Sequence, residues 1–411
     1  MRPLPEDNAD FRLSLCQLLN PDLVADPHPL YHRIRSTDPV RWDIFLRAWV
    51  VTQYDDVIWV LRNLPANRTP SQDRLSEGGL DHFSPITSVM EKQMLLSDPP
   101  YHTRIRRLVA SAFTADKIAG MADLIRRIAR KLLASAWDRG EMNVIPDFAD
   151  PFPGMVIAVM LGVPQEEYQQ LGIWAADFAE TFGNFTHNPA RTSEILQSCA
   201  EMTSYFRDCI SRFRNTPNDG LVCSFMTTNV DGDTLTEDEI VANSIGMLVG
   251  GYETAKNLIG TGLLTLLKHP EQMELLRRDG ALLGPAIEEL LRYNSPVQLT
   301  GRMPANGIEL HGKHISAGQP IIAVLGAANC DPDRFPDPDR FDVTRSDNRH
   351  VALGWGAHFC IGAGLARLEM RVALECLLNL PNLRLERDGL TWRSHLLFRG
   401  LTALPVSFDK Q

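Results

Sequence analysis

A single cysteine among glycines is the feature of this sequence most suited to chemistry. Cys360 lies in Leu353–Arg367, which has glycine at positions 354, 356, 362 and 364 and continues into a helical pattern. Glycines permit a tight backbone turn, and the N–H groups of a helix N-terminus favour thiolate over thiol. A lone thiolate held in this way suits a nucleophile, or a ligand to a metal that another frame already carries. Zinc would need more ligands nearby, and a plain loop around a buried thiol would not need these glycines.

Paired glycines lie in the middle of the longest predicted helix. Thr236 and Glu239 have the spacing of a capping box, and the chain stays helix-compatible until His269-Pro270. About 31 residues at 1.5 Å each give a rod of roughly 45 Å, which must cross a whole domain of this size. Gly250 and Gly251 lie in its middle and cost about 1 kcal/mol each relative to alanine. They predict either a flat body lying against the backbone or a local break in the helix.

An acid and an alcohol follow these glycines. Glu253 and Thr254 could order water and deliver protons to dioxygen bound beside the helix. The competing interpretation is a carboxylate that faces solvent and a hydroxyl that bonds back to its own helix. Lys256 is turned about 200° round the helix from Thr254, so it is predicted to face away from the reacting oxygen.

Composition and charge narrow the class of protein. The chain has 411 residues, 44 % of them apolar, and a formal net charge of −10 without a basic block, which argues against nucleic acid as a partner. No apolar stretch approaches the roughly 18–20 residues that span a bilayer, and the first residues lack the apolar core of a signal peptide. Seven scattered cysteines without a Cys-x-x-Cys pair predict free, buried thiols. We therefore expect a cytoplasmic protein with no membrane span.

The predicted fold class is mainly α with a small β region. No repeat, low-complexity run or flexible linker divides the chain, so we expect an N-terminal segment over residues 1–20 and a single domain over residues 21–411. Hydrophobic periodicity separates predicted helices from predicted strands. The helical segments are Ala119–Trp137, Glu194–Phe213 and Glu271–Leu276, and the strand segments are Val40–Trp49, Ile308–Ile315, Gln319–Val324 and Leu401–Phe408.

The cysteine loop resembles a known motif. Gly354-x-Gly356-x-His358-x-Cys360-x-Gly362 is similar to the haem-thiolate loop of the cytochrome P-450 family, with Leu353 where that family usually has phenylalanine. Gly250–Thr254 resembles the family's oxygen-activating motif. The resemblance runs from about Pro21 to Val406 with the motifs in the family's order. It implies the family's single-domain fold, with haem b (iron protoporphyrin IX) between the long central helix and the Cys360 loop.

The resemblance assigns the haem contacts. Cys360 would ligate the haem iron, and Gly250 and Gly362 would contact the haem itself. The implied propionate contacts are His102, Arg106, Arg302 and His358, with Arg302 following a strand over Pro296–Thr300.

A buried ion pair is also implied. Glu289 and Arg292 fit the family's Glu-x-x-Arg pair, and Arg340 resembles the arginine that joins it. The spacing is weak evidence, because Glu274 and Arg277 fit it equally well and such pairs are common on exposed helix faces. Glu289 is preferred because its helix ends at Tyr293–Pro296 and leads into a strand, as the family requires.

The implied activity is that of a monooxygenase, with secondary metabolism as the expected setting. Haem does the oxidation, Cys360 supplies electron density, and Glu253 with Thr254 supplies protons. One oxygen atom of O2 would enter a C–H bond, or form an epoxide, in a lipophilic small molecule. A fused reductase is not expected, so electrons would come from a separate ferredoxin and ferredoxin reductase. Arg104, Arg107 and Arg367 are candidates for a basic docking face.

Apolar positions indicate the substrate pocket. Met247 and Gly250 precede Thr254 on its face of the long helix, and by resemblance the pocket adds Val297, Leu299, Leu396 and Leu397 and the variable stretches Asn63–Ile86 and Trp174–Asn188. These positions favour a steroid, terpenoid, fatty acid, macrolide or aromatic compound. The alternative is that several of them merely fill the core.

Two other functions remain open. An enzyme of the same fold could use hydrogen peroxide directly, although such relatives lack the acid–alcohol pair. A non-catalytic haem-binding protein would have little use for Glu253 and Thr254. Peroxide-only activity that survives loss of both residues would favour the first alternative, and product formation with reductant and dioxygen discriminates against the second.

Overall fold

Helices form most of the chain. The computed structural model describes residues 10–66, 69, 72–77, 80–111, 113–182, 191–386 and 390–410. The helices in the first half are α1 (Pro21–Ala25), α2 (His28–Thr37), α3 (Tyr54–Asn63), α4 (Gln72–Glu77), α5 (Ser84–Met90), α6 (Tyr101–Ala110), α7 (Ala115–Gly120), α8 (Ala122–Trp137), α9 (Pro151–Leu161), α10 (Tyr168–Glu180) and α11 (Thr192–Asn215). Those that follow are α12 (Leu221–Thr227), α13 (Glu237–Lys268), α14 (Pro270–Arg278), α15 (Leu283–Asn294), α16 (Leu325–Asn329) and α17 (Ala363–Leu377).

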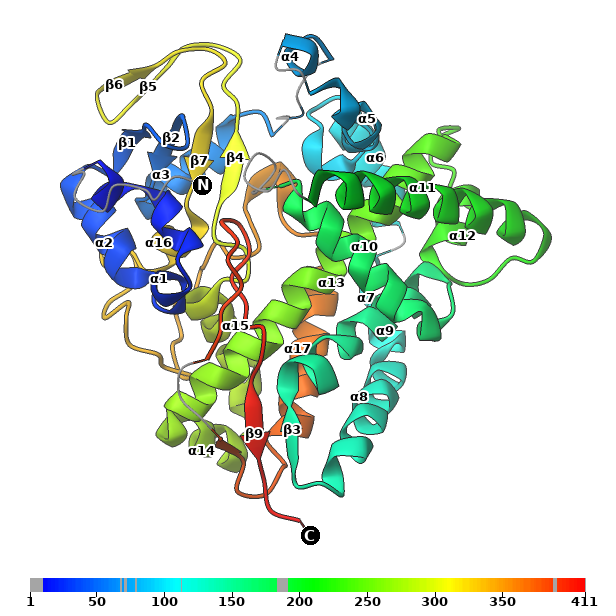
Figure 1. The fold of residues 1–411 in the computed structure, drawn as a ribbon, viewed down its shortest axis with the longest axis vertical. Helices are drawn as coiled ribbons and strands as arrows, with labels where there is room; N and C mark the ends of the chain where they lie inside the picture. The colour runs from blue at the N-terminus through cyan, green and yellow to red at the C-terminus, as the bar shows by residue number, and fades with distance from the viewer. Residues whose placement is uncertain are drawn as a thin grey trace.

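Helix α13 crosses the body of the molecule (Figure 1). Its 32 residues begin at the predicted capping box, in which the Glu239 N–H donates to Thr236 Oγ1 at 3.3 Å and the Thr236 N–H donates to the Glu239 carboxylate at 2.8 Å. It ends before Pro270, which opens α14. The helix is continuous through Gly250 and Gly251, so the predicted break is absent from it.

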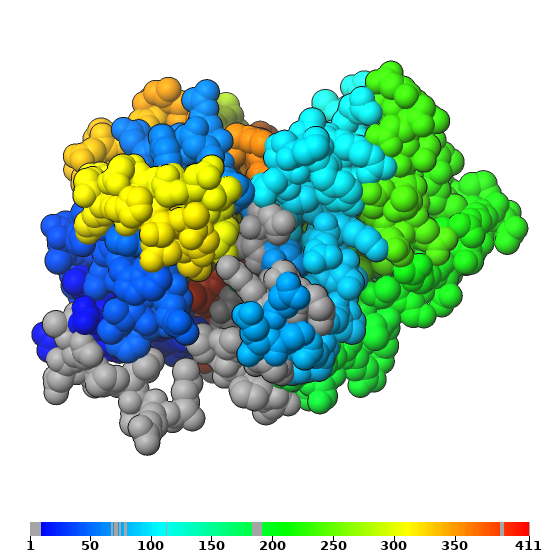
Figure 2. Space-filling model, turned by 90° about the horizontal axis from the view of Figure 1, so that it is seen from above, coloured from blue at the N-terminus to red at the C-terminus, as the bar shows by residue number. Residues whose placement is uncertain are grey.

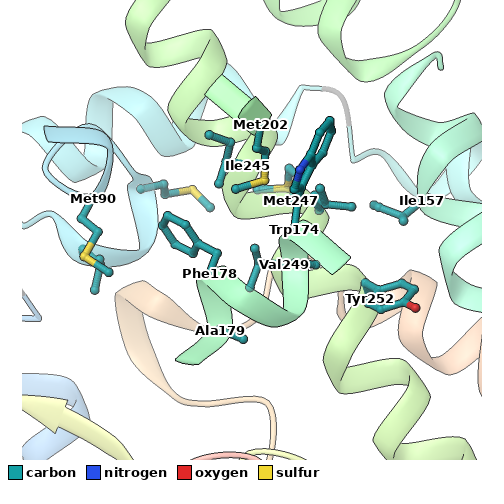
Figure 3. Packing of buried hydrophobic residues seen from close by; sticks show 14 of the residues in the cluster. Met90, Ile157, Trp174, Phe178, Ala179, Met202, Ile245, Met247, Val249 and Tyr252 are labelled. Carbon is teal, nitrogen blue, oxygen red and sulfur yellow. The ribbon is translucent and has the colours of Figure 1, made fainter. Parts of the chain in front are cut away.

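Two large hydrophobic clusters share α13. One packs its first half against α9, α10 and α11, and the other packs its second half against α8, α15 and α17. Figure 3 shows the first cluster, with Met247 and Val249 of α13 close to Trp174 and Phe178 of α10. The helix is therefore fixed on several sides, which also fixes the residues that it presents.

In the described ranges, the β structure is small and lies in three sheets. The four-stranded sheet has the order β1-β2-β7-β4, in which β2 and β7 are parallel and the other pairs are antiparallel. Its strands are β1 (Val40–Asp43), β2 (Ala48–Val51), β7 (Ile321–Ala323) and β4 (Thr300–Arg302). A three-stranded sheet contains β3 (Glu141–Asn143), β9 (Pro405–Ser407) and β8 (Arg384–Leu385), and a hairpin contains β5 (Ile308–Leu310) and β6 (Lys313–Ile315).

The predicted elements are found with shifted bounds. Val40–Trp49 and Ile308–Ile315 each divide into two antiparallel strands around a turn, where Arg47 and His311 have positive φ. The predicted strand over Pro296–Thr300 instead begins at Thr300 and ends at Arg302. Residues of the expected N-terminal segment join the main core, since Leu15 and Leu18 are fully buried in the first cluster.

From above, the molecule is hollowed between its β-rich part and its helical part. Figure 2 shows the hollow between the yellow strands and the cyan and green helices. Within the described ranges, no helix has both the length and the apolarity that a membrane span requires.

Candidate active site

Cys360 lies in a loop bent by glycines. Gly354 and Gly356 have φ values of 75° and 69°, in the left-handed region that glycine adopts at little cost. The loop closes where the Cys360 N–H donates to the Leu353 carbonyl at 2.8 Å. Helix α17 begins at Ala363, so the sulfur precedes a helix N-terminus as predicted.

The Cys360 side chain is half-buried. Burial raises the pKa of the Cys360 thiol above its ordinary value, while the Gly362 N–H and the charges of Arg106 and Arg367 act in the opposite direction. The helix end and the arginines therefore do not by themselves produce the thiolate that the sequence suggested. A bound metal cation would supply the missing stabilisation, because a coordinating thiol is deprotonated by its metal.

Two histidines and an arginine surround this loop. The rings of His102 in α6 and His358 lie 4.1 Å apart between centroids. Arg106, one turn after His102, donates from Nη2 to the Phe359 carbonyl at 2.7 Å. The sequence-predicted residues His102, Arg106 and His358 are thus brought together beside Cys360.

Buried donors without acceptors mark a place for an anion. Among the described residues, His102 is 2 % exposed and neither ring nitrogen has a hydrogen-bond partner. Arg302 is 4 % exposed, and its Nε also lacks a partner there. Burial lowers the pKa of Arg302 to about 10, and the charge of Asp98 opposes this effect. Buried polar groups are normally paired, so these donors fit a carboxylate ligand.

The two glycines of α13 have different neighbours. A Cβ on Gly250 would meet nothing within 4 Å, whereas a Cβ on Gly251 would lie 3.0 Å from Ile157 Cδ1 of α9. Gly250 therefore borders open space, and Gly251 allows α9 to approach. Of the two explanations that the sequence offered for the glycine pair, the open space at Gly250 favours a flat ligand lying against the helix.

Thr254 and Glu253 lie on different faces of α13. The Thr254 hydroxyl donates to the Gly250 carbonyl at 2.6 Å, which is the back-bond of the competing interpretation. Its oxygen lone pairs stay available to accept. Glu253 is fully buried rather than solvent-facing, and Arg393 donates to it at 2.5 Å. The Lys256 side chain is mostly buried, and its Nζ lies 3.6 Å from Glu253 Oε1.

The predicted pocket residues share one hydrophobic cluster. Met247, Leu299, Leu396 and Leu397 are buried members of it, and Val297 packs against it. The Gln298 N–H donates to the Leu397 carbonyl at 2.8 Å, and Val297 pairs with Phe398 in a β-bridge. The two predicted segments therefore lie side by side. Parts of the stretches Asn63–Ile86 and Trp174–Asn188 lie outside the described residues.

The Glu-x-x-Arg pair forms as predicted, but its third member differs. Arg292 Nε and Nη2 both donate to Glu289 at 2.8 Å, and both side chains are fully buried. The arginine that joins them is Arg345, whose Nε lies 3.2 Å from the Glu289 carboxylate. The prediction that Arg340 joins the pair is wrong. The Arg340 side chain is 66 % exposed and lies near Asp342, and only its backbone carbonyl accepts a hydrogen bond from Arg292. Arg340 points outward from a turn that leaves only its carbonyl facing inward.

Sequence reasoning missed three charged residues near the site. Arg393 and Asp150 surround Glu253 and Lys256, and Arg345 completes the Glu289 pair. No local motif marks them, because each meets its partner from a distant part of the chain. By contrast, Glu274 pairs on an exposed face with Arg278 rather than with Arg277, which donates to the Leu378 carbonyl.

The residues present fit a haem. A thiol beside a helix N-terminus can ligate iron. His102 and Arg302 have buried nitrogen atoms that could donate to the carboxylates of a haem. Gly250 leaves room for a flat ring. Within the described ranges, the His, Cys, Asp and Glu side chains form no cluster of three that could hold a metal ion. If the Cys360 sulfur is the protein ligand to a metal ion, the other ligands of that ion would come from a cofactor such as haem.

Comparisons with known proteins agree with this fit. The cytochrome P-450 family model matches residues 66–390. The chain is 35 % identical to the 6-deoxyerythronolide B hydroxylase of Saccharopolyspora erythraea over 405 residues, covering 95 % of this chain and 99 % of that protein. It is 34 % identical to the biotin biosynthesis cytochrome P-450 of Bacillus subtilis over 392 residues, covering 94 % of this chain and 98 % of the relative.

Solved structures give the same result. P450BioI in complex with an acyl carrier protein ligated to hexadec-9Z-enoic acid superposes with a TM-score of 0.88 at 33 % identity, covering 94 % of this chain and 99 % of that one. A myxobacterial cytochrome P-450 in complex with myristic acid gives a TM-score of 0.87 at 35 % identity, covering 96 % and 99 %.

The fold and the site fit a haem protein, and the matches extend over almost the whole chain. The chain belongs to the cytochrome P-450 family. Its relatives are named as hydroxylases and monooxygenases, and its enzyme class is that of the cytochrome P-450 monooxygenases.

Proposed function

We propose that this protein inserts one oxygen atom of O2 into a C–H bond of a lipophilic small molecule. The observation that carries the proposal is the Cys360 loop, which precedes a helix N-terminus and packs against the buried His102 ring, whose nitrogens have no hydrogen-bond partner among the described residues. A bound haem b would supply the oxidation chemistry, with Cys360 Sγ as the protein ligand to its iron. His102, Arg106, Arg302 and His358 would hold the propionates.

The chain itself would supply binding and protons. Thr254 would use its free lone pairs to hold a water molecule, since its hydroxyl already donates a hydrogen bond to the Gly250 carbonyl. Glu253 would be the buried acid that passes protons toward Thr254. A peroxide-driven reaction would not need these two residues, so retention of peroxide-only turnover after both are replaced would favour that alternative.

The apolar cluster supports a lipophilic substrate. Met247, Leu299, Leu396 and Leu397 have no charged group, and burial of apolar surface would drive binding. Relatives are named as a 6-deoxyerythronolide B hydroxylase and a vitamin D(3) 25-hydroxylase. One solved neighbour is in complex with myristic acid, and another with an acyl carrier protein ligated to hexadec-9Z-enoic acid. A screen of fatty acids, steroids and macrolactones by the ferric Soret shift should therefore give at least one saturable response.

Separate redox proteins would supply the electrons. The arginines suggested for docking are already paired, since Arg104 contacts Glu239 at 2.7 Å, Arg107 contacts Asp231 at 3.1 Å and Arg367 contacts Glu288 at 2.7 Å. Arg62 and Lys117 are exposed cations on helices that flank the Cys360 loop, because α3 approaches Gly356 and α7 approaches Gly364. We propose that an acidic ferredoxin contacts Arg62 and Lys117 instead. We also propose that the protein acts in the cytoplasm.

Replacement of the ligand tests the proposal. The reduced protein under carbon monoxide should show the red-shifted Soret band of a thiolate-ligated haem, and Cys360→Ser should lose it. Cys376→Ser is the matched control, since this half-buried free cysteine lies on the far part of α17. Product carrying label from isotopic O2, with a surrogate ferredoxin and reductase, should appear for the parent chain and for Cys376→Ser. Full haem binding without any turnover across the screen would favour the non-catalytic alternative.

A further inference from the structure

Five groups of alternating charge form a line through Glu253. Arg393 bridges Glu180 at 2.9 Å and Glu253 at 2.5 Å, and Lys256 bridges Glu253 at 3.6 Å and Asp150 at 2.8 Å. The line thus has two arms that meet at one buried carboxylate. The sequence predicted that Lys256 faces away from Thr254, and in the structure Lys256 contacts Asp150 and Glu253.

The Lys256 arm leads outward by steps. The side chain of Asp150 is 32 % exposed, that of Lys256 is 19 % exposed and that of Glu253 is 0 % exposed. Water can therefore reach Asp150, while Glu253 is reached only through its neighbours. Within the described part of the chain, Glu253 Oε1 has no hydrogen-bond partner, and Lys256 Nζ lies 3.6 Å from it.

The two cations have different chemistry. A guanidinium does not release its proton in a protein, so Arg393 can hold the carboxylate of Glu253 but cannot supply it with a proton. An ammonium group is a compact donor on a flexible stem that can give up a proton when partly desolvated. Lys256 is flexible enough to shorten the 3.6 Å separation from Glu253 Oε1 to a hydrogen bond.

A tyrosine fixes the outer end of this arm. The Tyr252 side chain lies in a slot between two glycines. A Cβ on Gly154 of α9 would come within 2.7 Å of its ring, and a Cβ on Gly172 of α10 would come within 2.5 Å of its hydroxyl oxygen. Its hydroxyl donates to Asp150 at 2.8 Å, and Figure 3 shows this hydroxyl pointing away from Trp174 and Phe178. The slot fixes the rotation of α13, which places Lys256 between Asp150 and Glu253.

We propose that Asp150 and Lys256 form the inlet through which protons from solvent reach Glu253. This inference rests on the proposed role of Glu253 as the proton-passing acid. Lys256 Nζ gives one proton to Glu253 Oε1, which leaves a neutral amine and a neutral carboxylic acid. The amine then recovers one proton from water held at Asp150, so the net change is one proton moved from solvent to Glu253. Lys256 is accordingly a positioning and relay residue that acts through Glu253.

Lys256→Arg separates relay from charge balance. An arginine keeps the positive charge beside Glu253 and Asp150 but cannot release a proton, so it should preserve the melting temperature and the substrate dissociation constant. It should lower the product formed per O2 consumed by about tenfold, within the range of a lost proton-transfer step, and raise the solvent isotope effect on product formation. Lys268→Arg, on the exposed last residue of the same helix, is the matched control and should match the parent chain.

Two further variants keep the outcomes distinct. Infrared difference spectra of the ferric holoenzyme, referenced to Glu253→Gln, should show the same Glu253 carboxylate signal in Lys256→Arg as in the parent. Full coupling and an unchanged isotope effect in Lys256→Arg would overturn the inlet and leave Lys256 as a counter-charge. If Glu253→Gln itself stays fully coupled, the proposed role of Glu253 fails instead. Tyr252→Phe, which removes only the hydroxyl at Asp150, should cause a smaller loss than Lys256→Arg.

Discussion

The imidazole rings of His102 and His358 stack with their planes inclined by 40°. The His102 ring comes from α6 and the His358 ring from the turn before Cys360, so this contact packs the cysteine loop against α6. Stacking uses the ring faces and leaves the nitrogen edges of His102 for a ligand. Burial lowers the pKa of His102, with Arg106 acting in the same direction and Asp98 opposing it, so a neutral donor is ready for a propionate.

His102→Phe should keep the stacking and remove the donor. We expect haem to dissociate about ten- to a hundredfold faster, because a hydrogen bond to a charged group contributes about 1.5–3 kcal/mol. Transfer of haem to excess apomyoglobin measures this rate. His82→Phe is the control, since the exposed His82 ring also lies over a neighbouring ring, that of Phe83. Equal rates for His102→Phe and the parent would remove His102 from the haem contacts.

Thr254→Val should uncouple oxygen consumption from product formation. The substitution retains the shape of the side chain but removes the lone pairs that hold water in the cavity, and a loss of about tenfold or more in product per O2 is expected. Thr261→Val is matched to it, because Thr261 makes the same back-bond to Asn257 at 2.7 Å but is buried in the core. Coupling should survive in Thr261→Val and in Thr254→Ser. A fully coupled Thr254→Val would restrict Thr254 to its helix back-bond.

Arg345→Leu should destabilise the protein far more than Arg340→Leu. Glu289 and Arg292 are fully buried and Arg345, which also contacts Glu289, is 12 % exposed. Because Arg292 remains, we expect a loss near the lower end of the about 3–5 kcal/mol that removing one partner of a buried ion pair costs. Arg340 is exposed, so its loss should change the free energy of unfolding by less than about 0.5 kcal/mol. Urea denaturation of the holoenzyme measures both. The reverse order would restore Arg340 as the third member.

Acid should weaken the fold through His395. Its Nδ1 accepts the N–H groups of Leu397 at 3.0 Å and Phe398 at 3.1 Å, and burial, with the charge of Arg393, lowers the pKa of His395 to about 4. The unfolded imidazole binds a proton below about pH 6.5. The stability contributed by neutral His395 is therefore complete above about pH 6.5 and is lost, by about 3 kcal/mol, as the pH falls toward 4.

His395→Asn should flatten this pH dependence. The asparagine oxygen can accept from the same backbone N–H groups and does not titrate. Unfolding free energies measured between pH 7 and pH 4.5 should fall less steeply for the variant. Parallel curves for the two proteins would assign the acid sensitivity to other groups.

The sequence by itself determined the local features of this protein. The capping box at Thr236, the stop at Pro270 and the glycines around Cys360 act on their own segments, so their outcome follows from nearby residues. The strand runs were found but not divided, because a turn such as that at Arg47 depends on how the two halves pair.

Only the tertiary structure decided which charges meet. Arg340 and Arg345 occupy the same loop, and only the path of the folded chain turns Arg345 toward Glu289. Arg393 and Asp150 reach the neighbourhood of Glu253 from distant positions on either side of it in the sequence. Ion pairs depend on distance and burial, which the chain sets only once its helices have packed.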